Sequence, residues 1–165
     1  MYEIKEVKHS NKDFINLCKK IDEYQNDLIP LRKNWGFSSL DEIDVLDKIL
    51  LMYDNEKAVA SASIRKVDNN TAELCSIYTE EAYRNKGICT LLINELIKYL
   101  ASNNYKKLIL YTLKGSIPAI SLYNKFGFVK INIEEKKEDM DHMSYLNNDT
   151  LEEIDKYTVY MEKIL

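Results

Sequence analysis

The segment from Tyr78 to Thr90 combines residue types that can hold an anion. It reads Tyr-Thr-Glu-Glu-Ala-Tyr-Arg-Asn-Lys-Gly-Ile-Cys-Thr, so that a strand ends, a loop with one glycine follows and a helix begins. The first N–H groups of a helix have no partner within it and lie at the positive end of its dipole, so they can bind a phosphate. Gly87 would let the backbone approach that anion. Neither GxxxxGK(S/T) nor GxGxxG is present, and taken alone the segment also fits an ordinary turn before an ordinary helix.

A second segment, residues 119–128, places a tyrosine on a short helix. Its sequence is Ala-Ile-Ser-Leu-Tyr-Asn-Lys-Phe-Gly-Phe, with Tyr123 directly after Leu122 and Gly127 near the end. Pro118 suits the first helical turn, and Gly127 suits the left-handed position that ends a helix. Alone, the pattern is weak evidence for chemistry, because a tyrosine on an amphipathic helix usually packs with only its hydroxyl in water.

Composition and charge exclude several classes of protein. The chain has 165 residues, of which 45% are apolar and 30% charged. These values are typical of a globular chain, and we expect a single domain over residues 1–165. The net charge of −4 disfavours nonspecific nucleic-acid binding, which needs clustered Lys and Arg. No apolar run approaches the roughly 18 residues that span a bilayer, and Met1-Tyr2-Glu3 does not resemble a secretion signal. We therefore expect a cytoplasmic protein that binds neither nucleic acid nor membrane.

The cysteines and histidines indicate neither disulfides nor a metal site. Cys18, Cys75 and Cys89 are scattered and form no CxxC pair, and His9 and His142 lie far apart in the sequence. This usage predicts free thiols in a reducing compartment and no bound metal.

Hydrophobic periodicity predicts an α/β chain in which one mixed central sheet is flanked by helices. Strands are expected at residues 2–7, 49–53, 58–66, 71–79, 107–113, 128–133 and 157–161. Helices are expected after a capping box formed by Ser10 and Asp13, over 40–46, over 87–102 and over 118–125. Short turns between the strands of residues 49–79 favour an antiparallel meander. The polar, acidic residues 134–155 predict a long loop or lid.

Together, in this order and at this separation, the two segments resemble the GNAT superfamily of acyl-CoA-dependent N-acyltransferases. The family pattern is (R/Q)xxGx(G/A) opening a helix after a strand, and later a helix of the form AxxLYxxxGF. Residues 84–89 match the first motif and residues 119–128 the second, while residues 72–78 are similar to the preceding strand, xELxxLYV. The resemblance is specific over about residues 48–133, is looser over the N-terminal helices and recurs at residues 159–163.

The resemblance implies a fold and a cofactor site. The fold would combine an antiparallel N-terminal meander with splayed parallel strands at the site of acetyl-CoA, the co-substrate. The backbone at Ile77, Tyr78 and Thr79 would pair with the pantetheine arm, and one N–H there would polarise the thioester carbonyl. The remaining cofactor-binding residues implied are Arg84, Asn85, Lys86, Gly87, Ile88, Cys89, Thr90 and Ser116. Two of them depart from the family pattern, since Cys89 replaces Gly or Ala and Ser116 replaces an Asn common in the family, but neither change removes a backbone donor.

Acyl transfer to an amine requires a neutral amine, a stabilised oxyanion and a protonated leaving thiol. Tyr123 is the candidate acid for the thiolate, since a phenol with a pKa near 10 matches a thiol of similar basicity. The alternative is that Tyr123 only positions the cofactor. Glu73 is the candidate base, acting through water, because some family members carry a glutamate at this spacing before the arginine of the first motif. The alternatives are an ion-paired strand residue or a different base. A covalent intermediate on Cys75 or Cys89 is disfavoured because no neighbouring histidine is evident.

Only the distribution of charged residues in the sequence bears on which amine is the acceptor. Carboxylates crowd two regions expected to border the acceptor groove: Asp22, Glu23, Asp27, Asp41, Glu42 and Asp44, and then Glu134, Glu135, Glu138, Asp139, Asp141, Glu152 and Glu153. Negative charge at a cleft attracts cations, so we expect a cationic amine such as a polyamine, an aminoglycoside, an amino acid or a basic peptide. Four alternatives stay open: a solvated acidic face, a peptide or protein N-terminus as acceptor, a module that binds acyl-CoA without turnover, and a role for His142 in the acceptor site. Dimers are common in the superfamily, but no residue here identifies a contact surface.

Overall fold

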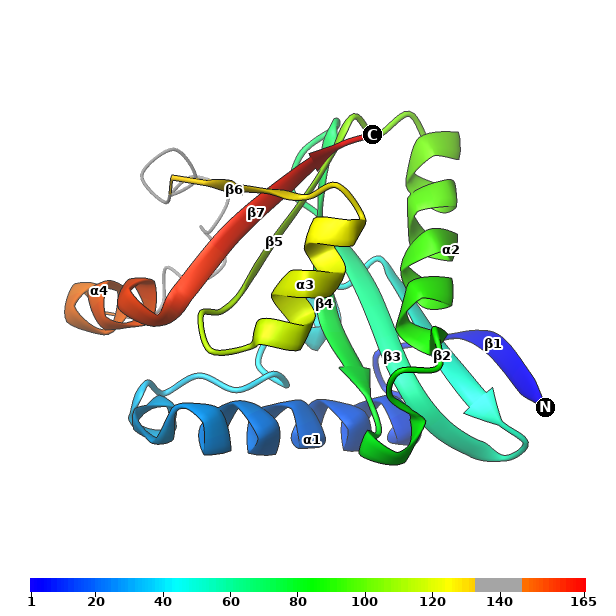
Figure 1. Cartoon of the computed structure of the whole chain (residues 1–165), viewed down its shortest axis with the longest axis horizontal. Coiled ribbons are helices and arrows are strands. Elements are labelled where there is room, and N and C mark those ends of the chain that lie inside the picture. The colour runs from blue at the N-terminus through cyan, green and yellow to red at the C-terminus, as the bar shows by residue number, and fades with distance from the viewer. Residues whose placement is uncertain (133–146) are drawn as a thin grey trace.

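The computed structural model describes residues 1–132 and 147–165 (Figure 1). In these residues the elements run β1 (Tyr2–Val7), α1 (Lys12–Leu28), the 3-10 helices η1 (Pro30–Asn34) and η2 (Ile43–Val45), β2 (Lys48–Asp54), β3 (Lys57–Lys66), β4 (Thr71–Thr79), η3 (Glu81–Tyr83), α2 (Ile88–Ser102), β5 (Lys107–Leu113), α3 (Ile117–Lys125), β6 (Val129–Ile131), α4 (Asn148–Tyr157) and β7 (Thr158–Ile164). None of the helices described there is both long enough and apolar enough to cross a bilayer.

The described strands form one mixed sheet in the order β1-β2-β3-β4-β5-β7-β6. Strands β1 to β4 pair antiparallel, which confirms the expected meander. Strands β4 and β5 pair in parallel only at Thr71–Lys107, Ala72–Leu108 and Glu73–Ile109. Beyond Glu73 the two strands diverge, as Figure 1 shows, so the splayed parallel strands are also confirmed. On the far side, β5 and β6 each pair antiparallel with β7.

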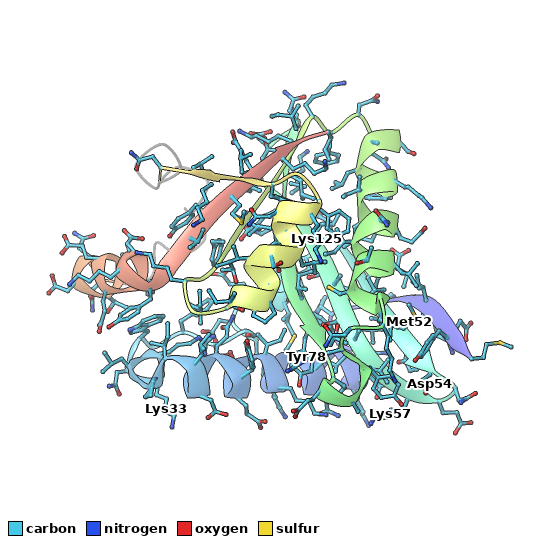
Figure 2. The ribbon with its side chains drawn as sticks, in the orientation of Figure 1. Lys33, Met52, Asp54, Lys57, Tyr78 and Lys125 are labelled. Atoms are coloured by element: carbon cyan, nitrogen blue, oxygen red, sulfur yellow. The ribbon has the colours of Figure 1, made fainter. Side chains whose placement is uncertain are left out.

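Helices cover both faces of the sheet because successive residues of a strand point to opposite sides. On β2, Leu50 and Met52 join the core beneath α2, whereas Ile49 and Leu51 pack with the buried residues of α1. Ile88, the first residue of α2, is 1% exposed. The packing therefore fixes the N-terminus of α2 against the sheet. Figure 2 shows Tyr78, near the end of β4, at the same end of the sheet as Asp54 and Lys57 of the β2–β3 hairpin.

Helix α1 begins one residue later than the sequence pattern indicated. The predicted capping box of Ser10 and Asp13 is wrong: Asn11 is the N-cap, and its Oδ1 accepts a hydrogen bond from the Phe14 N–H at 3.0 Å. Asn and Ser are almost equally good caps, so the sequence alone did not separate them. The helix expected over residues 40–46 is only the single 3-10 turn η2.

The C-terminal region contains a helix where a loop was expected. Residues 148–157 form α4, whose N-cap Asn147 accepts a hydrogen bond from the Thr150 N–H at 2.8 Å. The prediction of a loop or lid is therefore wrong over residues 148–155, while its part over 134–146 lies outside the described residues, as does His142. The helix packs through Leu151, Ile154 and Tyr157. These residues recur at helical spacing after the N-cap Asn147, so the sequence did carry a local signal for this helix.

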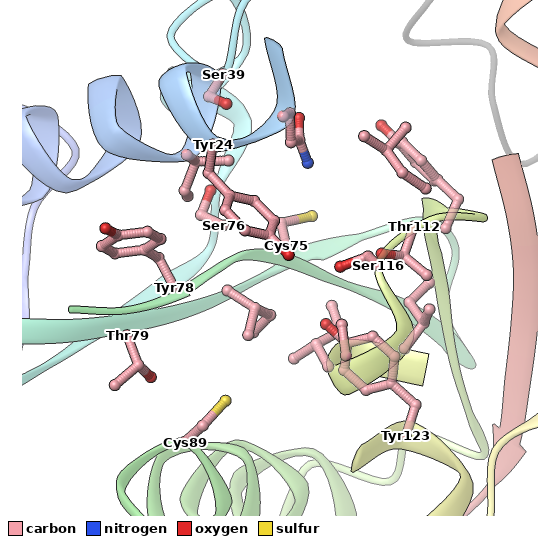
Figure 3. A pocket seen from close by; sticks show the side chains of 18 of the residues that line it. Tyr24, Ser39, Cys75, Ser76, Tyr78, Thr79, Cys89, Thr112, Ser116 and Tyr123 are labelled. Carbon is pink, nitrogen blue, oxygen red and sulfur yellow. The ribbon is translucent and has the colours of Figure 1, made fainter. Parts of the chain in front are cut away.

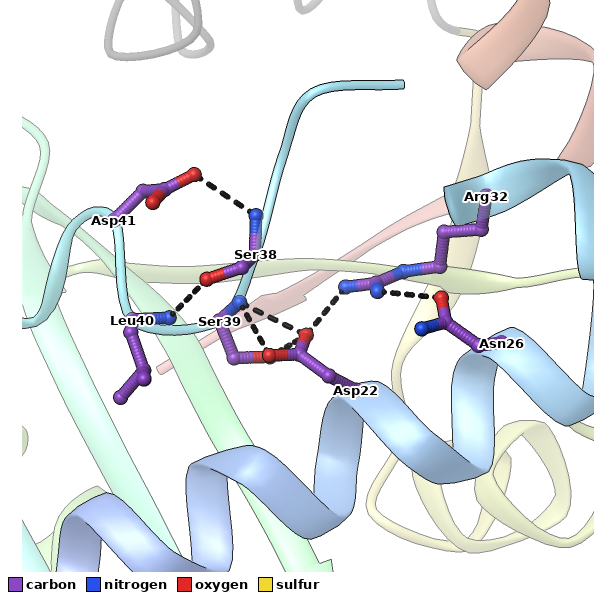
Figure 4. Close-up of polar contacts among 7 residues, drawn as sticks. All are labelled: Asp22, Asn26, Arg32, Ser38, Ser39, Leu40 and Asp41. Atoms are coloured by element: carbon purple, nitrogen blue, oxygen red, sulfur yellow. Dashed lines mark hydrogen bonds and ion pairs between the residues drawn. The ribbon is translucent and has the colours of Figure 1, made fainter. Parts of the chain in front are cut away.

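A buried ion pair joins α1 to the segment that follows it (Figure 4). Arg32 is 3% exposed; its guanidinium donates hydrogen bonds to the Oδ1 atoms of Asp22 at 2.8 Å and of Asn26 at 3.0 Å. The same Asp22 oxygen accepts hydrogen bonds from the N–H and the hydroxyl of Ser39, at 2.9 and 2.7 Å. The Arg32 guanidinium also lies over the ring of Phe37 at 5.6 Å. These contacts hold residues 32–39 against α1.

Asp22→Asn should lower the free energy of unfolding by about 3 kcal/mol, because removing one partner of a buried pair leaves the other charge uncompensated. Urea denaturation measures this loss. Asp27→Asn is the matched control, since Asp27 is an exposed carboxylate of the same helix, and it should change stability by less than about 0.5 kcal/mol. Equal effects of the two substitutions would contradict a structural role for the ion pair.

Candidate active site

A cavity of about 830 Å³ lies where β4 and β5 diverge. Figure 3 shows side chains from α1, β4, β5, α2 and α3 around it, among them Tyr24, Tyr78, Cys89, Thr112 and Tyr123. All of the catalytic and cofactor-binding candidates named from the sequence line this cavity, with the exception of Lys86. The Lys86 ammonium lies instead over the ring of Tyr83, at 5.2 Å. One cavity thus brings together the Arg84–Thr90 segment, Ser116, Glu73 and Tyr123.

A β-bulge in β4 accounts for the divergence of the strands. Ser76 has a φ of +50°, and the pairing of β3 with β4 shifts by one residue between Ser61 and Ser63. The hydroxyls of these serines donate to the backbone oxygens of Ser76 and Cys75, at 2.7 and 2.9 Å. A bulge bends its strand, and this one comes just after the last β4–β5 pair at Glu73. The sequence signal for this bulge is the pair of serines, Ser61 and Ser63, in the otherwise apolar middle of the neighbouring strand β3.

The loop before α2 has the backbone conformation of an anion-binding turn. Asn85 and Gly87 have φ values of +62° and +74°, and Gly87 is the N-cap of α2 with no side-chain cap among the described residues. Successive N–H groups in such turns converge on a common point. A Cβ at Gly87 would meet no atom within 4 Å, so the backbone conformation and not the space requires glycine there.

Arg84 anchors this loop. Its Nε donates a hydrogen bond to the backbone oxygen of Thr79 at 3.0 Å, and its guanidinium lies over the rings of Tyr24 and Tyr78 at 5.5 and 5.7 Å. The loop is therefore attached to the end of β4 and to α1.

Tyr123 is a buried phenol at the side of the cavity. It is 5% exposed, and its ring packs edge-on against Phe128 with centroids 5.9 Å apart. Burial raises the pKa of Tyr123 well above that of a free phenol, and the negative charges that Cys89 and Cys75 can carry raise it further. Tyr123 therefore stays protonated at physiological pH and is a hydrogen-bond donor. Tyr123 is therefore a weaker acid than the free phenol that the sequence analysis assumed.

Glu73 lies at the point where the strands separate. It is 2% exposed and forms an ion pair with Arg65, its cross-strand neighbour on β3. One alternative considered from the sequence was that Glu73 is an ion-paired residue of a strand, and the structure agrees with it. Protonation of Glu73 would cost the attraction of the guanidinium.

Glu42 is a second carboxyl group in the cavity. Burial raises the pKa of Glu42 to about 7; Asp41 and Asp44 raise it too, while Arg65 lowers it. From the sequence, Glu42 was only one acidic residue among many. The signal for its position was the apolar pattern around it, because Leu40, Ile43 and Leu46 pack against the buried residues of α1 and β2.

Glu42→Gln should raise the melting temperature more at pH 8 than at pH 5. A carboxyl whose pKa is raised from its ordinary value of 4.5 to about 7 in the folded chain loses stability as the pH rises from 4.5 through 7. The glutamine variant has no such loss, so the difference in melting temperature, variant minus wild type, should increase with pH. Thermal unfolding followed by circular dichroism at the two pH values measures it. A difference independent of pH would contradict the raised pKa.

The other acidic residues of the two predicted regions do not line the cavity, as far as the structure describes them. Asp22 is bound to Arg32, and the Asp41 carboxylate accepts a hydrogen bond from the Ser38 N–H at 2.8 Å. Glu134 to Asp141 lie outside the described residues. Of these two regions, Glu42 is the member seen in the cavity.

The cysteine thiols are protonated. Burial raises the pKa of Cys89 to about 12 and that of Cys75 well above its ordinary value. A protonated thiol is a weak nucleophile, because the thiolate is the form that attacks. In the part of the chain that the structure describes, no group of three or more His, Cys, Asp or Glu is placed to hold a metal ion.

The fold is that of acyl-CoA N-acyltransferases. PaiA N-acetyltransferase from Thermoplasma acidophilum, solved in complex with coenzyme A, superimposes with a TM-score of 0.73 at 15% identity, over 100% of this chain and 99% of that one. An acetyltransferase from Streptococcus agalactiae gives a TM-score of 0.74 at 19% identity, over 99% of this chain and 98% of that one.

Residues 11–128 match the family model described as "Acetyltransferase (GNAT) family", and the chain belongs to this family. Among curated proteins, YobR of Bacillus subtilis, described as an uncharacterized N-acetyltransferase, is 32% identical over 81 residues. That match covers 49% of this chain and 32% of YobR, so the chain spans about a third of the relative's length.

Proposed function

We propose that the chain transfers an acetyl group from acetyl-CoA to a primary amine by direct attack in a ternary complex. The observation that carries the proposal is the single cavity in which the turn at Asn85 and Gly87, the diverging end of β4 and Tyr123 come together. A relative with this fold, PaiA, was solved with coenzyme A. The raised pKa values of Cys75 and Cys89 favour direct transfer over an acyl-enzyme.

In this proposal acetyl-CoA supplies the thioester, and the backbone of the chain binds it. The N–H groups of Asn85 to Thr90 hold the diphosphate, supported by the dipole of α2 and by Arg84. The backbone of Ile77, Tyr78 and Thr79 lies unpaired toward β5, because the β4–β5 ladder ends at Glu73, and it pairs with the pantetheine arm. One of these N–H groups stabilises the oxyanion, and Ser116 contacts the cofactor from the start of α3.

Two side chains serve the proton transfers. Tyr123 donates a proton, or a hydrogen bond, to the departing thiolate. Glu73 accepts the amine proton through water, and in doing so gives up part of its attraction to Arg65. A small cationic amine or amino acid is the favoured acceptor, and a peptide N-terminus is the alternative.

Cys18, Cys75 and Cys89 are unpaired, which agrees with a cytoplasmic setting.

Isothermal titration with acetyl-CoA, followed by a thiol-release assay with a panel of amines and mass detection of the acetylated product, tests the proposal. We expect saturable binding and an amine-dependent release of coenzyme A. Binding without release for any amine or peptide would favour a non-catalytic acyl-CoA-binding module. Absence of binding to both coenzyme A and acetyl-CoA would overturn the proposal.

A further inference from the structure

Residues of α1 and of the segment that follows it form part of the cavity lining. We call this part the α1 side; it comprises Ile21, Tyr24, Trp35, Phe37, Glu42 and Ile43. We propose that the α1 side binds an acceptor with one ammonium group on an apolar, ring-sized body, and that Glu42 is the anion that receives the ammonium. This inference rests on the proposed function and specifies its acceptor.

Apolar and aromatic side chains dominate the α1 side. Trp35 is 4% exposed and packs with Tyr157 of α4 at a centroid distance of 5.9 Å. Phe37 is held beside it by the contact of its ring with Arg32. Such walls favour an apolar body, because each Å² of apolar surface removed from water contributes about 25 cal/mol.

The charge in this region suits a single cation. Glu42 and Glu73 are the carboxylates among the described residues that line the cavity. Of the cations that line it, Arg65 is paired with Glu73 and Arg32 with Asp22, while Arg84 and Lys125 come from the loop before α2 and from the end of α3. The group of Glu42, Arg65 and Glu73 therefore carries one net negative charge when Glu42 is ionised. A polyamine or an aminoglycoside brings several ammonium groups, and each one buried without a partner costs several kcal/mol. The multivalent acceptors expected from the sequence fit this cavity less well than a monoamine.

Trp35 provides an independent indication of a ligand. Its indole Nε1 is buried and has no hydrogen-bond partner among the described residues, and the side chain lines the cavity. Buried donors are almost always paired in native proteins. An acceptor molecule that also carries an oxygen would supply the missing partner.

Binding of the ammonium should depend on pH. The groups that face Glu42 are Arg65 on β3, Glu73 and Cys75 on β4, Tyr111 on β5, and the flanking Asp41 and Asp44. The pKa values of Cys75 and Tyr111 are raised chiefly by burial, so both are neutral. The ionised fraction of Glu42 falls as the pH drops through about 7, and affinity for the ammonium should fall with it.

The single tryptophan of the chain allows a test that does not require turnover. Tyramine, tyrosol (the same body with a hydroxyl in place of the amine) and spermidine are titrated into the full chain, with and without coenzyme A, and Trp35 fluorescence is read. We expect tyramine to bind more tightly than spermidine. Glu42→Gln should weaken tyramine binding about 10- to 100-fold, as expected for a hydrogen bond to a charged group, and leave tyrosol unchanged. Asp44→Asn, an exposed carboxylate two residues away, is the matched control.

The outcomes separate this inference from the proposed function. Tyramine binding that depends on Glu42 would support the acceptor site even if the chain had no affinity for coenzyme A. If coenzyme A binds and acetyl transfer occurs, but spermidine equals tyramine or Glu42→Gln equals Asp44→Asn, the acceptor inference is overturned and the acyltransferase proposal stands.

Discussion

Tyr123→Phe is expected to lower kcat for acetyl transfer by about 100-fold, the lower end of the usual contribution of a general acid. The substitution removes one oxygen from a buried ring and keeps the packing against Phe128. The dissociation constant of acetyl-CoA, measured by titration calorimetry, should therefore stay within about twofold. Because burial raises the pKa of Tyr123, the loss should be similar from pH 6 to pH 9.

The control for this variant is Tyr99→Phe. Tyr99 is exposed on α2, where the Lys48 ammonium lies 4.5 Å from its ring centroid, and it does not line the cavity. Its substitution should leave kcat unchanged. If Tyr123→Phe weakened acetyl-CoA binding and kept kcat, Tyr123 would be a positioning residue. If neither quantity changed, the role assigned to its hydroxyl would be wrong.

Thr90→Glu is expected to weaken acetyl-CoA binding by about 100-fold, since placing a negative charge beside a bound diphosphate costs a few kcal/mol in a partly buried site. Thr90 lies in the first turn of α2 and lines the cavity. A glutamate in the first helical turn is favourable for the helix itself. The melting temperature of the free chain should therefore not fall, which separates loss of binding from loss of folding.

Leu91→Glu is the matched control for Thr90→Glu. Leu91 is the next residue of α2, is half exposed, and does not line the cavity. Its substitution adds the same charge to the same helix and should change acetyl-CoA affinity less than about threefold. Equal weakening by both variants would mean that the diphosphate is not held at the start of α2.

Much of the fold could be predicted because local patterns agree with it. The run Ile49–Tyr53 is entirely apolar and buried, as expected for an inner strand, and Gly127 has the left-handed φ of +86° expected at a helix end. The Arg84–Thr90 and Ala119–Phe128 motifs carried the family resemblance, which the family match confirmed. Local periodicity and two motifs were thus enough to predict the mixed sheet, helices α2 and α3 and the family.

The features that could not be predicted depend on contacts between distant residues. Arg65 and Glu73 meet because β3 and β4 pair in one register, and Glu42 joins them from a loop whose path depends on the Asp22–Arg32 ion pair. The bulge at Ser76 is supported by hydroxyls of β3, and a single strand gives no measure of such support. Helix α4 is different, because the helical spacing of Leu151, Ile154 and Tyr157 was a local signal for it, while the acidic character of the segment favoured a loop.

The short parallel seam between β4 and β5 has a mechanical consequence. Long ladders join β1 to β4 and join β5 to β7, but three residue pairs join β4 to β5. Helix α2 packs on β2, β3 and β4, and its buried residues share a core with Leu108 and Leu110 of β5. We expect the sheet to flex most readily between β4 and β5, because fewer backbone hydrogen bonds have to strain there than in the longer ladders. A molecule bound across the opening and in contact with both strands would oppose this flexing.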